Sequence, residues 1–436
     1  MKVEPLGKSQ IEASIVGLGT YYFGGGDGSS APDDKETIQI VHSALDEGIS
    51  LIDTAPSYGF GHCEQVIGKA IKDRRDKAVV ATKCGLWWQD ERGSPNGEKD
   101  GRNQYISLRP DTIKIEVENS LRNLKTDYID LLQVHKPAIP PDDTPIEDTM
   151  RCLMELKQQG KIRAIGISNV TVDQLATYDA HGDLSSNQFR YSMLHKNPEA
   201  DILPYCIENE IASKTYKSLE QGLLTGKINL ERQFDKNDWR SNAGQWLPWF
   251  KKENLERLLN MFSQWEDLLD EYHCSIAQLT VAWTAAQPGI SHILCGAKSV
   301  SQIVNNANSG SIALSEGEIN RMSNDIKKGL MGVTVDETGI SKVMPEINSL
   351  TYRGYAAQDL CAKCKFEEVA YLILNGELPN KKQLKEFEKQ ERNERKLSKT
   401  LLQDIKNFPK KAHPMDVART AVSIMGLEDK ETKDNT

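Results

Sequence analysis

The chain alternates short runs of apolar residues with stretches of helical periodicity from about residue 10 to residue 310. The eight apolar runs are IVGLGT, ISLIDTA, KAVVATKCG, YIDLLQVHK, RAIGISNV, SSNQFRYS, EIASKTYKSL and ISHILCGA. The amphipathic stretches between them include DKETIQIVHSALDEG, RPDTIKIEVENSLRNLK, DTPIEDTMRCLMELKQQG and CSIAQLTVAWTAAQP. Strands and helices that alternate in this way over about 250–300 residues predict a (β/α)8 TIM barrel in the α/β class.

A doubly wound open sheet is the alternative fold for such a pattern. That fold normally carries G-x-G-x-x-G at its first strand-to-helix turn, where glycines let the backbone approach a pyrophosphate. The early glycines do not fit that spacing, since they stand at Gly17, Gly19, Gly24, Gly25 and Gly26. The barrel is therefore preferred.

Two long polar segments, residues 85–108 and 227–252, interrupt the barrel pattern and are interpreted as loops. They contain the tryptophans Trp87, Trp88, Trp239, Trp246 and Trp249. Long loops after barrel strands usually shape the substrate pocket. Trp87 and Trp88 are accordingly predicted to bind substrate, with Trp246 as a further specificity residue. The alternative is that these side chains only fix the loops in place.

A length of 436 residues exceeds what one hydrophobic core usually organises and predicts two domains. The formal net charge of −9 argues against a general nucleic-acid binder, because phosphate contacts need clustered Lys and Arg. No apolar run is long enough to span a membrane, and the first residues lack the apolar core of a secretory signal. We expect a cytoplasmic protein with no nucleic-acid or membrane partner, and its oligomeric state is left open.

The eight cysteines are spread along the chain and are interpreted as reduced thiols rather than a disulfide framework. Cys361 and Cys364 form the C-x-x-C pair, within a stretch that is predicted to be helical, AAQDLCAKCKFEEVAYLIL. Because a zinc site needs more ligands than one such pair supplies, we predict no metal.

Polar side chains follow three consecutive predicted strands. Asp53 comes after ISLI, Lys83 after AVVAT and His135 after LLQV, while Tyr58 lies in the turn DTAPSYG. In a barrel these positions meet at the carboxyl ends of the strands, where catalytic side chains project. We therefore expect the four residues to form one site.

These four residue types suit the reduction of a carbonyl group. Hydride addition leaves an alkoxide that needs a proton donor, and Tyr58 is the predicted donor. An unperturbed phenol has a pKa of about 10, and an adjacent ammonium brings that pKa toward the working pH. Lys83 is expected to have this effect, Asp53 to keep Lys83 charged and oriented, and His135 to donate a hydrogen bond to the carbonyl oxygen.

Several motifs along residues 1–328 resemble the aldo-keto reductase family. They are GISLIDTAPSYGFGHCEQVIGKAI, VVATKCG, LRNLKTDYIDLLQVH, GKIRAIGISNV and QGLLTGK. The resemblance implies that Asp53, Tyr58, Lys83 and His135 are the catalytic tetrad of a nicotinamide-dependent oxidoreductase. Its substrate would be a small aldehyde or ketone whose identity the sequence does not reveal.

The same resemblance implies the cofactor site. Ser168, Asn169 and Gln188 would surround the nicotinamide carboxamide, and Tyr216 would stack on the nicotinamide ring. The remaining positions would line the cofactor entrance or hold the adenosine phosphate: Gly19, Thr20, Tyr21, Gly296, Lys298, Gln302 and Asn306. Lys298 precedes a predicted helix whose N-terminus favours anions, which makes NADPH the expected cofactor ahead of NADH.

The run IASKTYKSL departs from the apolar strand that the family usually has at this place. Lys214 stands inside the predicted strand, with Lys217 and Ser218 at its turn. A buried, unpaired ammonium is costly, so Lys214 must reach solvent or find a carboxylate. The turn would lie beside the cofactor pyrophosphate, which Lys217 is placed to bind.

Residues 329–436 have a different character. They begin with a strand-poor segment, continue into charged helical stretches and end in a tail, GLEDKETKDNT, that is expected to fray. GVTVDETGISKVMPEINSLTYRGYAAQDLC, FEEVAYLILNGELPN and KKAHPMDVARTAVSIMG resemble the N-terminal part of citrate and 2-methylcitrate synthases. We predict a truncated, mainly α-helical module without condensing activity, because His413 does not belong to that family's catalytic His, His and Asp.

Several interpretations remain open. The C-terminal module is an interaction appendage, a fusion remnant or a gene-joining artefact. The barrel is an active reductase, or it holds nicotinamide as a regulatory or scaffold subunit without turnover. A bifunctional enzyme that joins carbonyl reduction to methylcitrate formation is the third hypothesis, which the missing synthase residues disfavour.

Overall fold

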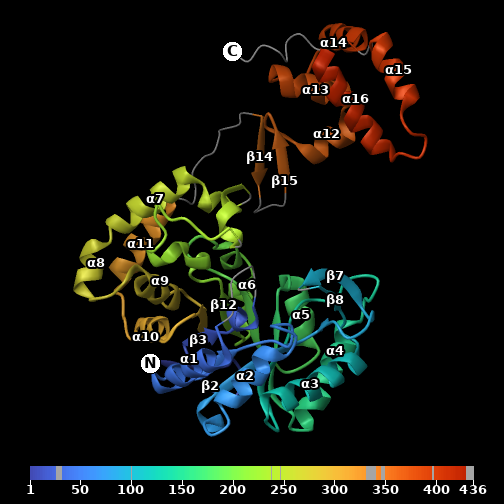
Figure 1. Cartoon of the computed structure of the whole chain (residues 1–436). Helices are drawn as coiled ribbons and strands as arrows, with labels where there is room; N and C mark the ends of the chain where they lie inside the picture. The colour runs from blue at the N-terminus through green and yellow to red at the C-terminus, as the bar shows by residue number, and fades with distance from the viewer. Residues whose placement is uncertain are drawn as a thin grey trace. The chain divides into compact units, whose positions relative to one another are not determined.

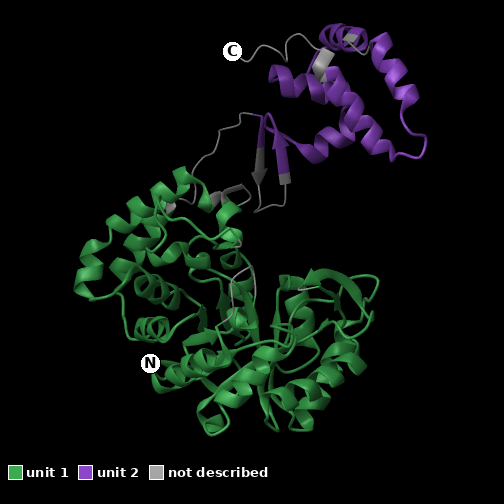
Figure 2. Ribbon diagram, in the orientation of Figure 1, with its two compact units in different colours: residues 1–333 green, residues 334–436 purple. Residues whose placement is uncertain are grey.

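The computed structural model describes residues 1–25, 32–99, 101–236, 238–245, 247–329, 340–344, 349–394 and 397–428. The chain forms two compact units, Met1–Val333 and Thr334–Thr436 (Figure 2). Unit 1 contains a closed barrel surrounded by helices, and unit 2 is mainly helical. The predicted fold class is therefore confirmed for both parts of the chain.

Eight parallel strands close the barrel in unit 1 (Figure 1). The strands are neighbours in the order β10-β11-β12-β13-β3-β4-β5-β9, and β9 pairs with β10 to close the ring. Each strand overlaps one of the eight predicted apolar runs. Their bounds are β3 Val16–Gly19, β4 Leu51–Asp53, β5 Val79–Cys84, β9 Ile129–Val134, β10 Ile162–Ser168, β11 Leu184–Arg190, β12 Ala212–Tyr216 and β13 His292–Gly296.

The helices of unit 1 cover the outside of this barrel. The first of them begins behind Asp33, whose carboxylate accepts a hydrogen bond from the Glu36 nitrogen, and stops before Gly48, which has a φ of +81°. The helices are α1 Asp34–Asp46, α2 His62–Ala70, α3 Pro110–Leu124, α4 Ile146–Gln158, α5 Val172–Ala180, α6 Ile202–Glu208, α7 Lys252–Ser263, α8 Glu266–Glu271, α9 Ile276–Ala285, α10 Val300–Ser309 and α11 Glu316–Gly329.

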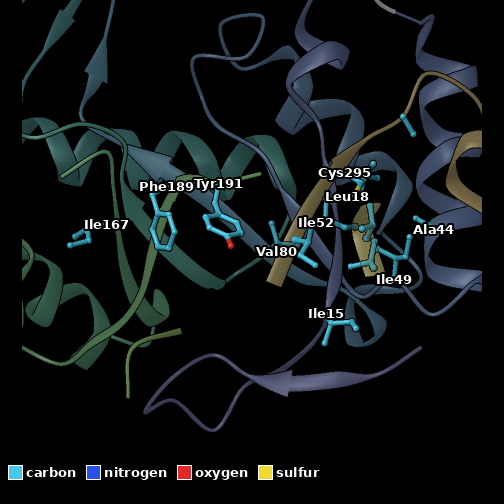
Figure 3. Close-up of a cluster of buried hydrophobic side chains, with 14 of the residues drawn as sticks. Ile15, Leu18, Ala44, Ile49, Ile52, Val80, Ile167, Phe189, Tyr191 and Cys295 are labelled. Atoms are coloured by element: carbon cyan, nitrogen blue, oxygen red, sulfur yellow. The ribbon is translucent and has the colours of Figure 1, made fainter. Parts of the chain in front are cut away.

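Alternate residues of each barrel strand face opposite sides, which separates two cores. Residues such as Ile52 and Val80 belong to the large core between strands and helices (Figure 3). Their strand neighbours Leu51 and Ala81 belong to a smaller cluster inside the barrel. That cluster also contains Leu6, Ile11 and Ala13 from the hairpin of β1 Val3–Pro5 and β2 Glu12–Ser14, together with Leu131, Ala164, Ala212 and Leu294.

Closer to the carboxyl ends of the strands, the side chains inside the barrel are polar instead of apolar. Asp53 lies two positions beyond Leu51, Lys83 two beyond Ala81 and Lys214 two beyond Ala212. All three are buried. The strand periodicity thus collects charged groups at one level inside the barrel.

Residues 85–108 are not an irregular loop, which corrects the sequence-based expectation. They form an antiparallel sheet in the order β6-β8-β7, with β6 Leu86–Trp87, β7 Ser94–Lys99 and β8 Arg102–Ile106. The segment 227–252 contains short 3-10 turns, Trp239–Gln245 and Pro248–Phe250. Trp246 lies outside the described residues.

Unit 2 begins with short strands, although the sequence predicts few strands in this segment. An antiparallel sheet, β14 Ser341–Met344, β15 Ser349–Tyr352 and β16 Tyr355–Ala356, precedes its helices. The helices are α12 Ala357–Lys363, α13 Phe366–Asn375, α14 Lys381–Glu394, α15 Lys399–Asn407 and α16 Pro414–Glu428. The end of the predicted frayed tail, residues 429–436, lies outside the described residues.

Cys361 lies in α12, whereas Cys364 follows its end in extended conformation, so the two do not share one helix as expected. Within the described ranges, no group of three or more His, Cys, Asp or Glu side chains is arranged to hold a metal ion. Across those same residues, no helix combines the length and apolar character needed to cross a membrane.

Candidate active site

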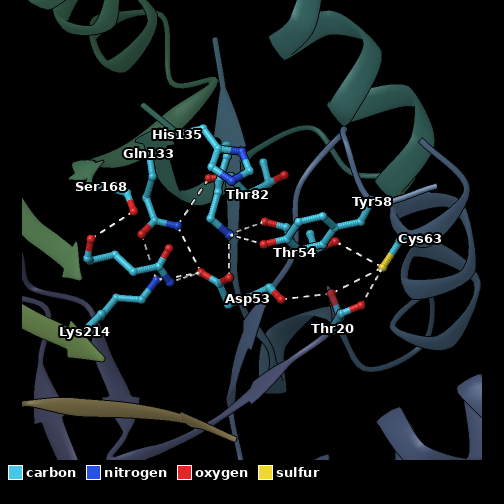
Figure 4. A network of polar contacts seen from close by, with 12 residues as sticks. Thr20, Asp53, Thr54, Tyr58, Cys63, Thr82, Gln133, His135, Ser168 and Lys214 are labelled. Carbon is cyan, nitrogen blue, oxygen red and sulfur yellow. Dashed lines mark hydrogen bonds and ion pairs between the residues drawn. The ribbon is translucent and has the colours of Figure 1, made fainter. Parts of the chain in front are cut away.

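The carboxyl ends of β4, β5 and β9 bring the predicted tetrad together (Figure 4). Asp53 is the last residue of β4, Lys83 lies in β5 and His135 directly follows β9. Lys83 Nζ lies 2.5 Å from Asp53 Oδ1 and 3.4 Å from the Tyr58 hydroxyl. The rings of Tyr58 and His135 meet edge to face with their centroids 6.1 Å apart.

Lys83 is only 2% exposed and has polar neighbours on several sides. In addition to Asp53 and Tyr58, its ammonium contacts the Thr54 carbonyl oxygen at 2.9 Å. Burial lowers the pKa of Lys83, but Asp53 and Tyr58 raise it, and the result lies above the usual value. The ammonium therefore stays charged at neutral pH.

The Tyr58 phenol differs from the expectation in one respect. Burial raises its pKa above 10, Lys83 lowers it and Asp53 raises it. Lys83 thus acts in the expected direction, but burial outweighs it, and the net pKa does not move toward neutrality. Tyr58 consequently holds its proton at neutral pH, as a proton donor must.

His135 is held at the rim of the site through its main chain. Its nitrogen donates to the Cys84 carbonyl at 2.9 Å, and the Asn169 side-chain amide donates to the His135 carbonyl at 2.9 Å. Burial and the nearby Lys83 charge place the pKa of His135 well below 6.5. A neutral imidazole carries one N–H that can donate to a substrate oxygen.

Asp53 accepts hydrogen bonds from four side chains. Lys83 contacts Oδ1, whereas Gln133, Gln188 and Lys214 contact Oδ2 at 3.1, 3.0 and 3.0 Å. Burial raises the pKa of this carboxyl group, but the two lysines outweigh burial and hold it far below its usual value. Asp53 is thus an anion at the centre of a polar cluster.

Lys214 is paired with a carboxylate, as a buried ammonium group requires. It is fully buried, and besides Asp53 it donates to Gln133 Oε1 at 3.0 Å. Burial lowers the pKa of Lys214 to about 8. The alternative expectation, that Lys214 extends to solvent, is wrong.

Gln133 is a site residue that the motif analysis missed. It stands in β9 two positions before His135, which follows the strand, so strand periodicity directs both side chains to the same side. The same parity argument relates Lys214 to Tyr216 on β12. The two-residue spacing of side chains along a strand was therefore the sequence signal that could have identified Gln133.

The residues expected at the nicotinamide carboxamide gather at the ends of β10, β11 and β12. Ser168 donates to the Gln188 carbonyl at 2.9 Å, and Asn169 donates to Ser168 Oγ at 3.0 Å. The Tyr216 hydroxyl donates to Asn169 Oδ1 at 2.7 Å. Asn169 has a φ of +60°, a left-handed conformation that asparagine tolerates.

The residues expected at the cofactor entrance follow β3. Thr20 is buried and its hydroxyl donates to the Asp53 carbonyl at 2.9 Å. The ring of Tyr21 lies edge to face with Tyr58, with centroids 5.2 Å apart. Gly19 pairs with Asp53 on β4 and with Gly296 on β13, so Gly19 borders the tetrad.

The residues expected at the adenosine phosphate surround the start of α10. The Lys298 nitrogen donates to Gln302 Oε1 at 2.6 Å, and Asn306 donates to the Gly296 carbonyl at 3.3 Å. The Lys298 ammonium lies over the Tyr22 ring, 4.6 Å from its centroid. Burial lowers the pKa of Lys298, Arg240 lowers it further and Asp238 raises it. Arg240 is itself paired with Asp238 through contacts of 2.9 and 2.6 Å.

Trp87 and Trp88 line a cavity of about 250 Å³ together with Pro56 and Phe60, which flank Tyr58 in its turn, and with residues of α3. The tetrad side chains themselves are not among its lining residues. Trp87 is buried and its indole N–H donates to Asp90 at 2.7 Å, while Trp88 packs edge to face on Phe60. These contacts hold both side chains in place within the segment.

The barrel is similar to known proteins over almost its whole length. Residues 15–326 match the Aldo/keto reductase family. The chain is 40% identical over 324 residues to the NADH-specific methylglyoxal reductase of Escherichia coli, covering 74% of this chain and 97% of that protein. The solved glycerol dehydrogenase AKR11B4 from Gluconobacter oxydans is 35% identical with a TM-score of 0.67, covering 77% of this chain and 98% of that one.

Residues 329–436 match a second family, described as Citrate synthase, C-terminal domain. The motif resemblance assigns them to the N-terminal part of a synthase, a position that the family description does not share. Over 107 residues the chain is 58% identical to 2-methylcitrate synthase 2 of Corynebacterium glutamicum, covering 24% of this chain and 28% of that protein. The chain thus spans about a quarter of the length of this relative.

Proposed function

The chain belongs to the aldo/keto reductase family of oxidoreductases, and from that premise we propose that its barrel reduces a small aldehyde or ketone to the alcohol with a proton from Tyr58. The observation that carries the proposal is the contact of the Tyr58 hydroxyl with Lys83, which Asp53 holds in turn. These groups lie at the carboxyl ends of the strands, where barrel enzymes place their chemistry.

Each side chain has a separate task in this reaction. The neutral His135 donates a hydrogen bond to the carbonyl oxygen and polarises it. Tyr58 transfers its proton to that oxygen, and the Lys83 ammonium stabilises the phenolate that remains. The nicotinamide cofactor supplies the hydride when bound.

The residues present fit a nicotinamide dinucleotide. Gln188 contacts Asp53 and Asn169 contacts the His135 carbonyl, so both border the tetrad. Ser168 contacts Gln188, and Tyr216 contacts Asn169. We infer NADPH as the preferred form, because Lys298 provides positive charge for a 2′-phosphate near the start of α10. The E. coli relative is named NADH-specific, so this preference needs a direct comparison of the two cofactors.

The substrate class follows from two relatives that act on small oxygenated molecules, according to their names. We propose small aldehydes and ketones, methylglyoxal among them, as substrates. Trp87 and Trp88 stay as proposed substrate-binding residues, although the cavity that they line excludes the tetrad.

Cofactor consumption with a panel of small aldehydes and ketones tests the proposal, with NADPH and NADH measured in parallel. Turnover that Tyr58→Phe removes supports it. Tight cofactor binding, seen as quenched tryptophan fluorescence, without turnover of any carbonyl would instead indicate a nicotinamide-binding regulatory subunit.

We propose residues 1–328 and 329–436 as the two domains, the second without condensing activity. The synthase-like part corresponds to 28% of its relative, which supports an incomplete active site. Release of CoA from propionyl-CoA and oxaloacetate would contradict this and revive the bifunctional hypothesis.

A further inference from the structure

Two buried ammonium groups share one carboxylate inside the barrel. Lys83 contacts Asp53 Oδ1 at 2.5 Å, and Lys214 contacts Oδ2 at 3.0 Å (Figure 4). All three side chains are at most 4% exposed. With both lysines protonated, the trio of Asp53, Lys83 and Lys214 carries one more positive than negative charge.

Among the described residues, the main charges that act on Lys214 are Asp53 on β4 and Lys83 on β5, and Gln133 on β9 contributes a neutral amide oxygen. The buried carboxyl group of Glu64 acts on Lys83 and is hydrogen-bonded to Thr82. His292, its register partner on β13, is buried, and burial lowers the pKa of that imidazole to about 4. His292 is therefore neutral at neutral pH.

We propose that Lys214 is a positioning residue for the proposed reduction: it fixes Asp53 through Oδ2 and supplies the buried positive charge that offsets Asp53 when Tyr58 becomes a phenolate. This inference rests on the proposed function. Lys214 acts through Asp53 and needs no contact with substrate or cofactor.

Asp53 has two opposing effects on the proposed proton donor. It orients Lys83, which stabilises the phenolate, but its own negative charge disfavours the phenolate. A cation on the far oxygen of Asp53 reduces the second effect and leaves the first intact. In the reduction, the carbonyl carbon gains the hydride, its oxygen gains the Tyr58 proton, and the phenolate then recovers a proton from water.

The protonation of Lys214 predicts a pH signature. Because its pKa is lowered to about 8, Lys214 is charged below that pH and neutral above it. The rate of carbonyl reduction should therefore decline above about pH 8 as the charge of Lys214 is lost. In a variant that has no ionisable group at this position, that decline should be absent.

Lys214→Met and Lys214→Gln separate charge from hydrogen bonding, because Gln keeps a donor for Asp53 and Met does not. In both we expect kcat for reduction to fall about tenfold at pH 7, with cofactor affinity within about twofold of wild type. For the reverse oxidation of the alcohol, where the Tyr58 phenolate accepts the proton, the midpoint of the pH profile should rise by about one unit. Lys114→Met, which removes an exposed ammonium from α3, is the matched control and should leave the profile unchanged.

Unchanged pH profiles in folded Lys214→Met and Lys214→Gln would overturn the inference, as would a shift in Met alone, which would assign the effect to the hydrogen bond. If wild type binds the cofactor but turns over no carbonyl, the proposed function fails separately. The inference is then tested by ¹³C NMR of labelled tyrosine, with the Tyr58 signal assigned by Tyr58→Phe. A higher ionisation midpoint in Lys214→Met than in wild type supports it, and equal midpoints in the two proteins contradict it.

Discussion

Gly24 lies directly against the main chain of Tyr58. A methyl group at Gly24 would stand 2.5 Å from the Tyr58 carbonyl carbon and 2.6 Å from the Gly59 nitrogen. The turn after β3 and the turn after β4 are therefore packed backbone to backbone, without room for a side chain between them.

Gly24→Ala should displace Tyr58 and lower kcat by at least about tenfold, because small misplacements of reacting groups are costly. The affinity for the cofactor should change less than kcat. Steady-state kinetics and cofactor titration measure both quantities. Gly317→Ala, whose added methyl group meets nothing closer than 3.9 Å, is the control and should behave like wild type.

Tyr58→Phe should reduce turnover at least about a hundredfold, since it removes the proposed proton donor and keeps the ring. Binding of NADPH should stay nearly intact, as the hydroxyl acts on the substrate side. The measurements are cofactor consumption and quenching of tryptophan fluorescence. Near-normal turnover in this variant would refute the assignment of Tyr58.

Lys83→Met should also remove most turnover, because it takes away the ammonium that stabilises the phenolate. Lys83 lowers the pKa of Tyr58, so its loss raises that pKa further. Any remaining alcohol oxidation, which needs the phenolate, should therefore shift to higher pH. A pH profile of that oxidation checks the direction, and a shift to lower pH would contradict it.

Lys298→Ala should weaken NADPH binding about tenfold and change NADH binding little, because the amino group is proposed to meet the 2′-phosphate. The ratio of kcat/KM for the two cofactors measures this, and NADH serves as the internal control. Equal losses with both cofactors would mean that Lys298 does not recognise the phosphate.

Removal of residues 329–436 should leave carbonyl reduction by the barrel within about twofold of the full chain, since the tetrad lies wholly in unit 1. Purified residues 1–328 should also unfold cooperatively. Kinetics and thermal unfolding of the two proteins provide the comparison. Loss of activity in a folded barrel would point to a role for unit 2 in the reaction.

The barrel strands could be predicted because each is an apolar run between turn signals, buried on both faces. The sheet of β6, β7 and β8 could not, since strands such as SPNGEK and RNQYI are mostly polar and depend on each other for pairing. Local sequence carries little information about such edge structure.

The candidate site shows a similar division. The positions of Asp53, Lys83 and His135 follow from strand ends, so they could be placed near one another before the structure was known. The partner of Lys214 could not be identified, because its contact with Asp53 joins β12 to β4 across the barrel interior. The pKa of Tyr58 is raised by its burial, and burial can be seen only in the folded structure.

The pairing of β13 with β3 determines when the barrel can close during translation. Residues 16–19 form hydrogen-bonded neighbours with residues 293–296, so the ring of strands stays open until nearly three hundred residues have left the ribosome. Because the chain emerges from its N-terminus, the first strand waits with an unpaired edge for most of translation. Closure can begin once β13 has emerged, while unit 2 is still being made, so the open barrel is the stage at which chaperone protection should matter most.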